Sequence, residues 1–74
     1  MTFEVSTSYV STEHWNLTEE QYERFSAHME SKFGKYWKSN PGANDEARNW
    51  LHIETEPDED IPGEESQFLV RKFN

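Results

Sequence analysis

LTEEQYERFSAHMESKFG, residues 17–34, is the stretch that decides the fold. Thr18 and Gln21 have the spacing of a capping box, in which each side chain accepts a hydrogen bond from the backbone N–H of the other residue. Lys32 falls in the last turn, where a positive charge favours a helix, and Gly34 can adopt the left-handed conformation that ends one. The stretch therefore predicts a helix with both ends specified.

Apolar side chains repeat along this helix at spacings of three, four and four residues. They are Tyr22, Phe25, Met29 and Phe33. This spacing places them on one face of an α-helix. The helix therefore needs an apolar surface to cover, and we expect the rest of the chain to supply it.

Three further segments alternate between apolar and polar residues, a pattern typical of half-buried strands. They are residues 3–10, 49–55 and 66–73. In the second segment the alternation predicts that Leu51 and Ile53 share one face. In the third, Leu69 and Phe73 fall on the face opposite Phe68 and Val70, so we expect that strand to be central or to meet a partner.

The predicted fold is α+β in the order strand, helix, strand, strand, with one helix packed on a three-stranded antiparallel or mixed sheet. The first strand can run parallel to the second through a right-handed crossover, or it can pair with the third. Residues 11–16, 34–48 and 56–65 are predicted connections, with room for one helical turn at 44–48. All 74 residues are predicted to form one domain.

The chain is strongly acidic. It has 15 acidic and 7 basic residues, a formal net charge of -8 and a pI near 4.7. Direct binding to nucleic acid or anionic lipid needs clustered Lys and Arg, so both are disfavoured. The charge favours rapid encounter with a basic protein surface.

The chain has no cysteine, so it offers no disulfide, thiolate metal ligand or cysteine nucleophile. It has no segment resembling a secretory signal and no apolar stretch of about 18 residues. We therefore expect a soluble cytoplasmic protein. Three histidines are candidate metal ligands, but no two of them lie three or four residues apart, so we expect them to be ordinary surface or boundary residues. They are His14, His28 and His52.

Two further patterns suggest chemistry weakly. Asp58, Asp60 and Gly63 match positions one, three and six of a calcium-binding loop, but Leu69 stands where the loop needs a bidentate carboxylate. Paired carboxylates can hydrolyse glycosides, yet a chain this short leaves little volume for a pocket of about 300 Å³ or more. We expect no catalytic residue, no metal, no cofactor and no enzymatic activity.

The remaining feature is the distribution of the carboxylates, which is dense between residues 54 and 65 and along the helix. An electronegative face of this kind can imitate the phosphates of duplex DNA and occupy the basic channel of a nuclease or nucleic-acid-binding complex. Trp37 and Trp50 are candidate anchors, because Trp is enriched at binding hot spots. The predicted partner contacts are Glu19, Glu20, Glu23, Glu30, Trp37, Trp50, Glu54, Glu56, Asp58, Glu59, Asp60, Glu64 and Glu65.

The leading hypothesis is a non-enzymatic protein, monomeric or dimeric, that docks on a basic protein and inhibits or regulates it. In size, charge and lack of cysteine the chain is similar to small acidic inhibitors that phages encode against host nucleases and defence complexes; this similarity is compositional and assigns no residue a role. One alternative is an assembly subunit that dimerises through Leu69 and Phe73. Another is a single-stranded nucleic-acid binder that uses aromatic residues, suggested by Lys35, Tyr36, Trp37 and Lys38.

Overall fold

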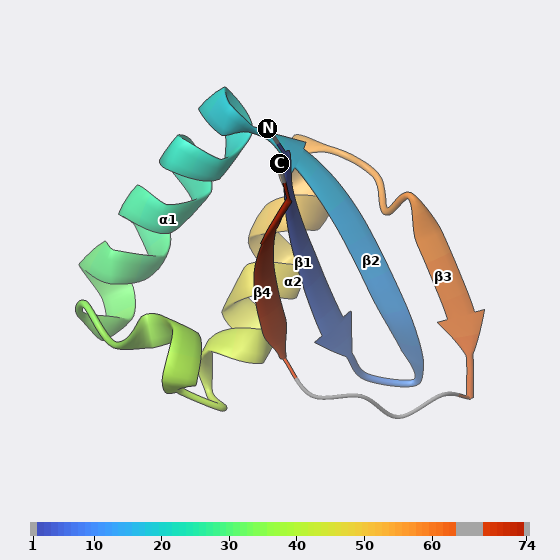
Figure 1. Cartoon of the computed structure of the whole chain (residues 1–74). Coiled ribbons are helices and arrows are strands. Elements are labelled where there is room, and N and C mark those ends of the chain that lie inside the picture. The colour runs from blue at the N-terminus through green and yellow to red at the C-terminus, as the bar shows by residue number, and fades with distance from the viewer. Residues whose placement is uncertain (1, 64–67, 74) are drawn as a thin grey trace.

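The computed structural model describes residues 2–63 and 68–73. It is an α+β fold with a four-stranded antiparallel sheet and two α-helices (Figure 1), so the predicted class is confirmed, while the predicted three strands and single helix are corrected. The elements are β1 (Thr2–Ser8), β2 (Ser11–Thr18), α1 (Glu19–Phe33), the 3-10 helix η1 (Trp37–Ser39), α2 (Ala43–Glu54), β3 (Glu59–Pro62) and β4 (Leu69–Phe73).

The strands lie in the order β3-β2-β1-β4, and every neighbouring pair is antiparallel. Val5 in β1 is opposite Trp15 in β2 and Val70 in β4, which places the three side chains on one face. The first strand therefore pairs with the last, one of the two arrangements that the sequence allowed. β4 is an edge strand and not a central one.

β2 was predicted as a connection, and the structure corrects this. The predicted strand 3–10 ends at Ser8, the chain turns at Tyr9 and Val10, and Ser11–Thr18 returns beside β1. Trp15 and Leu17 alternate with polar residues along β2 and are buried. The turn lacks the Gly, Asn or Asp that usually marks a two-residue hairpin, so the first strand was predicted to continue through Tyr9 and Val10.

α1 confirms the predicted helix. The Thr18 hydroxyl accepts a hydrogen bond from the N–H of Gln21, and the Gln21 side chain accepts one from the N–H of Thr18. Gly34 has a positive φ of 84° and donates its N–H to the carbonyl of Glu30. Phe25 and Met29 of the apolar stripe are fully buried.

Residues 49–55 were predicted as a strand, and the structure shows instead that most of this segment belongs to α2. Ala43, Ala47 and Leu51 recur every fourth residue and are all buried, as one face of a helix requires. Ile53 is 84% exposed, so it does not share the buried face with Leu51. The short alternation in 49–55 was misleading because the helical period begins earlier, at Ala43, within the segment 34–48 that was predicted as a connection.

The predicted connection 56–65 contains the short edge strand β3, which pairs with β2. Asp58 opens this pairing by donating its N–H to the carbonyl of His14 at 2.8 Å. Glu64 and Glu65, together with Ser66 and Gln67 of the predicted last strand, lie outside the described residues.

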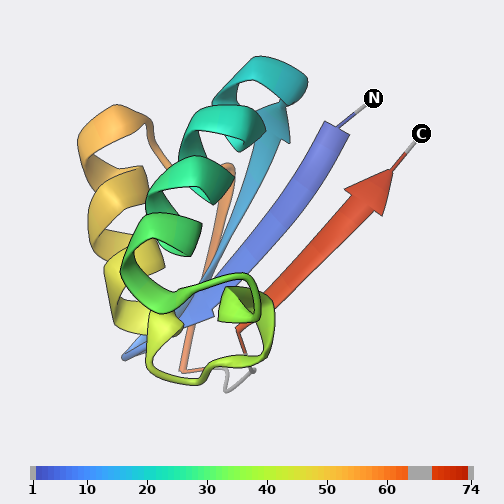
Figure 2. The ribbon, with the colours of Figure 1, turned by 90° about the vertical axis from the view of Figure 1, so that its left-hand side faces the viewer.

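Both helices cover the same face of the sheet (Figure 2), and the core fills the space between them. The buried residues of this core are Val5, Trp15, Leu17, Phe25, Met29, Trp37, Ala43, Ala47 and Leu51. None of the described helices covers the opposite face of the sheet, which is largely polar. Over the described residues, neither helix is long and apolar enough to cross a membrane.

Candidate partner-binding surface

The two α-helices bring carboxylates from distant parts of the chain to one end of the molecule. Phe25 and His28 contact the ring of Trp50 with centroid distances of 5.6 and 6.0 Å, and Lys32 reaches Glu46 at 3.4 Å. In these contacts, later residues of α1 pair with earlier residues of α2, so the two helices run antiparallel. The beginning of α1 and the end of α2 therefore lie together, as Figure 2 shows.

Asp58 is fixed at this same end. Its carboxylate accepts a hydrogen bond from the backbone N–H of Asn16 at 2.6 Å, close to the start of α1 at Glu19. Its own backbone N–H donates a hydrogen bond to the backbone carbonyl of His14. The connection from α2 to β3 therefore passes beside the end of β2 that leads into α1, and Asp58 has a structural role in addition to its charge.

Six of the predicted contacts belong to the segments that lie at this end, and we call them the acidic end. All six are exposed. Glu20 forms an exposed ion pair with Arg24 at 3.5 Å, a contact that contributes little stability in water. The acidic end is therefore a solvated, strongly negative surface. Its members are Glu19, Glu20, Glu23, Glu54, Glu56 and Asp58.

The structure separates the other predicted carboxylates from the acidic end. Glu30 lies in the last turn of α1, about 10 Å along the helix from Glu23 at 1.5 Å per residue. Glu59 and Asp60 follow on β3, at the edge of the sheet. Glu64 and Glu65 lie outside the described residues.

The two predicted tryptophan anchors belong to the interior and its margin. Trp37 is only 2% exposed and meets the Phe25 ring edge-on at 5.4 Å. Trp50 is partly buried between Phe25 and His28. In the folded protein Trp37 has no surface to offer a partner, and Trp50 offers only part of its ring.

Ile53, which was predicted to share one face of a strand with Leu51, is an exposed apolar side chain. It lies in the last turn of α2, directly before Glu54 of the acidic end. An exposed apolar side chain next to a charged one is a common composition at an interface. The spacing of Ala43, Ala47 and Leu51 was the signal that could have revealed it, since that period directs residue 53 away from the core.

Each histidine has a polar partner within the protein. The ring of His14 lies 2.6 Å from the Ser6 hydroxyl, and the carboxylate of Glu13 accepts hydrogen bonds from His52 at 2.9 and 3.0 Å. Among the residues that the structure describes, no three His, Asp or Glu side chains are grouped to hold a metal ion. Ser6 is 1% exposed, so its hydroxyl is not placed to attack a substrate.

The Glu46 carboxylate joins the two helices. Oε2 accepts a hydrogen bond from His28 at 2.6 Å, and Oε1 accepts one from Lys32 at 3.4 Å. The bond from His28 holds the pKa of Glu46 below its ordinary value, and the charge of Lys32 acts in the same direction, although partial burial opposes both. The contact stabilises the helix pair that forms the acidic end.

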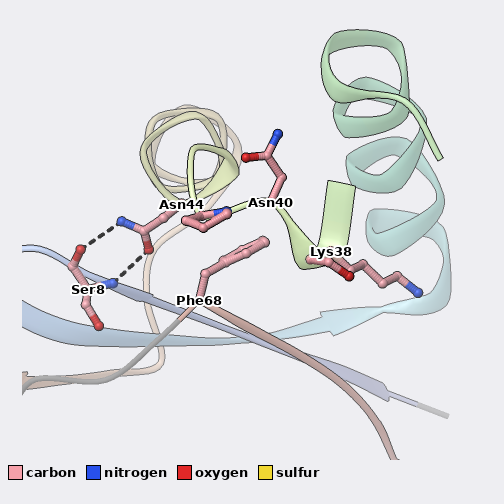
Figure 3. Close-up of a pocket in the computed structure, with 7 residues that line it drawn as sticks. Ser8, Lys38, Asn40, Asn44 and Phe68 are labelled. Carbon is pink, nitrogen blue, oxygen red and sulfur yellow. Dashed lines mark hydrogen bonds between the residues drawn. The ribbon is translucent and has the colours of Figure 1, made fainter. Parts of the chain in front are cut away.

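A cavity of about 500 Å³ lies at the opposite end of the molecule. Its volume is larger than was expected for a chain of this length. The Asn44 side chain closes one wall by accepting from the N–H of Ser8 at 3.0 Å and donating to its carbonyl at 2.8 Å (Figure 3). The ammonium group of Lys38 points away from Phe68 and lies 5.7 Å from the Tyr22 and Trp37 rings. The lining residues are Ser8, Lys38, Ser39, Asn40, Pro41, Asn44 and Phe68.

The lining is a mixture of hydroxyl, amide and ring surfaces, and several of its polar groups already have partners. Asn40 accepts the N–H of Gly42 at 2.9 Å, and both polar atoms of the Asn44 amide are bonded to Ser8. The cavity therefore offers weaker recognition chemistry than the acidic end.

No protein family, curated protein or solved structure matches this chain.

Proposed function

We propose that this protein is a non-enzymatic binding protein that docks its acidic end on a basic protein and thereby inhibits or regulates it. The partner is a nuclease or another protein that handles nucleic acid, because such proteins present the clustered cations that a dense set of carboxylates attracts. The observation that carries the proposal is that six exposed carboxylates, from three separate segments, lie at one end of a folded domain.

The composition of this surface supports binding by complementary charge. Attraction between opposite charges accelerates encounter and selects against acidic partners. Ile53 adds an apolar group next to Glu54, which contributes burial once the partner covers it. The partner surface is therefore expected to be a cationic rim around an apolar recess.

The test is affinity capture from the lysate of the source organism, using wild-type protein and two variants of equal net charge. The first variant neutralises the acidic end with Glu23→Gln, Glu54→Gln and Glu56→Gln. The second, the control, adds three positive charges at exposed neutral positions outside it, Val10→Lys, Ser31→Lys and Ser39→Lys. Both variants have a formal net charge of -5, because each changes the wild-type charge of -8 by three.

We expect one basic nucleic-acid-handling protein to bind the wild type and the control, and to bind the first variant about tenfold more weakly, since exposed charge pairs contribute up to about 1 kcal/mol each. Duplex DNA should compete with the wild type for that protein. Equal losses for both variants would show that only total charge matters. A partner that binds DNA and this protein simultaneously would contradict the mimicry of nucleic acid.

A further inference from the structure

The two edges of the sheet carry opposite charge. β3 forms one edge and contains Glu59 and Asp60, both exposed. β4 forms the other edge and contains Arg71, also exposed, followed by Lys72 in the sequence. Among the described strands, none pairs with the outer side of either edge. An unpaired strand edge can accept a strand from another chain.

The helices do not cover the sheet evenly. In Figure 1, α1 lies on the β4 side of the molecule, and no helix lies behind β3. Two packed helices and four strands have similar widths of about 20 Å, so a helix layer displaced towards one edge leaves the other edge bare. One edge therefore has a helix beside it, and the other has a strand with both faces open.

The core margin beside β4 is apolar and incompletely covered. Tyr22 of α1 stacks on Phe3 of β1 at 3.9 Å, and both remain partly exposed. Phe68, directly before β4, and Val70 within it are also only partly buried. A strand added beside β4 would supply backbone hydrogen bonds at this margin.

We propose that β3 of one copy of this protein adds to β4 of another copy, so that the sheet continues head-to-tail from one molecule to the next. Strand directions alternate through β3-β2-β1-β4, so β3 of the next copy runs antiparallel to β4 when the helices of both copies stay on the same side. The contact is independent of the proposed binding function.

One register matches the helix-free face of the added strand. Ile61 is opposite Thr12, and Leu69 is opposite Ser6, so Glu59 and Ile61 lie on the same helix-free face as Leu69 and Arg71. Matching these faces in antiparallel order sets Glu59 opposite Arg71 and Ile61 opposite Leu69. The register therefore gives one pair of opposite charges and one apolar pair, both favourable across strands.

Pairing between identical edges is less favourable. Two β3 strands would bring acidic residues together, and Pro62 has no N–H to donate. Two β4 strands would direct both α1 helices into the same space, because α1 lies on that side of each molecule (Figure 1). The head-to-tail contact avoids both conflicts.

The test is sedimentation equilibrium of the full-length protein from micromolar to millimolar concentration. Salt should be about 0.15 M, where charges more than about 8 Å apart are largely screened, so the net charge of the chain opposes association only weakly. We expect the average mass to rise with concentration beyond that of a dimer, because every head-to-tail contact leaves one β3 and one β4 edge free.

Charge reversal identifies the contact. Glu59→Arg and Arg71→Glu each place like charges opposite one another and should weaken association about tenfold. An equimolar mixture of the two variants should associate as the wild type does, because each contact between one variant and the other again joins opposite charges. Asp45→Arg and Lys35→Glu, which make the same charge changes at exposed positions away from both edges, are the matched controls.

Restored association in the mixture also separates the contact from a folding defect, since a misfolded variant would not be rescued by mixing. A wild-type protein that stays monomeric at millimolar concentration would overturn the proposal. So would a mass that stops rising at the dimer, or a mixture that associates no better than its two components.

Discussion

The hydroxyl of Thr7 is buried on the core-facing side of β1 and has no hydrogen-bond partner among the described residues. A buried polar group without a partner loses its bonds to water and gains nothing in return. Thr7→Val keeps the shape and removes the hydroxyl, so it should raise the free energy of unfolding by about 1 kcal/mol. Urea unfolding measures the change.

Thr12→Val is the matched control for that substitution. Thr12 is as deeply buried but has an interaction partner, so its replacement should lower stability or leave it unchanged. An equal gain in both variants would show that the benefit comes from apolar character at any strand position, and not from the unsatisfied hydroxyl of Thr7.

Glu46 should make stability depend on pH in the acid range. Its folded-state pKa is lowered mainly by the hydrogen bond from His28, so its contribution is complete above the unfolded-state pKa of about 4.3 and is lost as pH falls through the folded-state value. Unfolding followed by circular dichroism from pH 7 to pH 2 should therefore show wild type more stable than Glu46→Gln near neutrality, with the difference shrinking as the pH falls below about 4.3. A difference that stayed constant as the pH fell would contradict this role.

At the scale of elements, α1 could be predicted because its signals are local. The capping box, the apolar stripe and the terminal glycine all lie within residues 17–34. β2 and α2 could not be predicted in the same way. The turn at Tyr9 and Val10 has no turn-specific residue, and the face of α2 is marked only by two alanines and Leu51. Their structures are decided by packing against β1 and α1, which no short segment reveals.

Two neighbouring substitutions distinguish the helix from the strand expected for residues 49–55. Leu51→Ala removes a fully buried side chain and should cost about 2 to 5 kcal/mol, whereas Ile53→Ser changes a side chain that is 84% exposed and should cost less than about 0.5 kcal/mol. Thermal and urea unfolding of both variants measure the contrast. A similar large loss for both would place the two side chains on one buried face, as in a strand.

At the scale of the whole molecule, the sequence indicated an acidic surface but not its location. Carboxylates remain solvated, so the exposure of Glu54 and Glu56 could be expected from composition alone. Their position at the same end of the molecule as Glu19 depends on the antiparallel pairing of two helices, and α2 was not predicted. Trp37 failed as a surface anchor for the same reason, since a core formed by η1 and α1 encloses it.

The salt dependence of partner binding tests the acidic end most directly. Once the captured protein is purified, its dissociation constant should be measured by calorimetry across a series of salt concentrations for the wild type and the two variants of equal charge. Affinity should fall steeply with salt for the wild type and for the variant with added lysines, and less steeply when Glu23, Glu54 and Glu56 are neutralised. The same slope for all three proteins would show that the acidic end is not the contact.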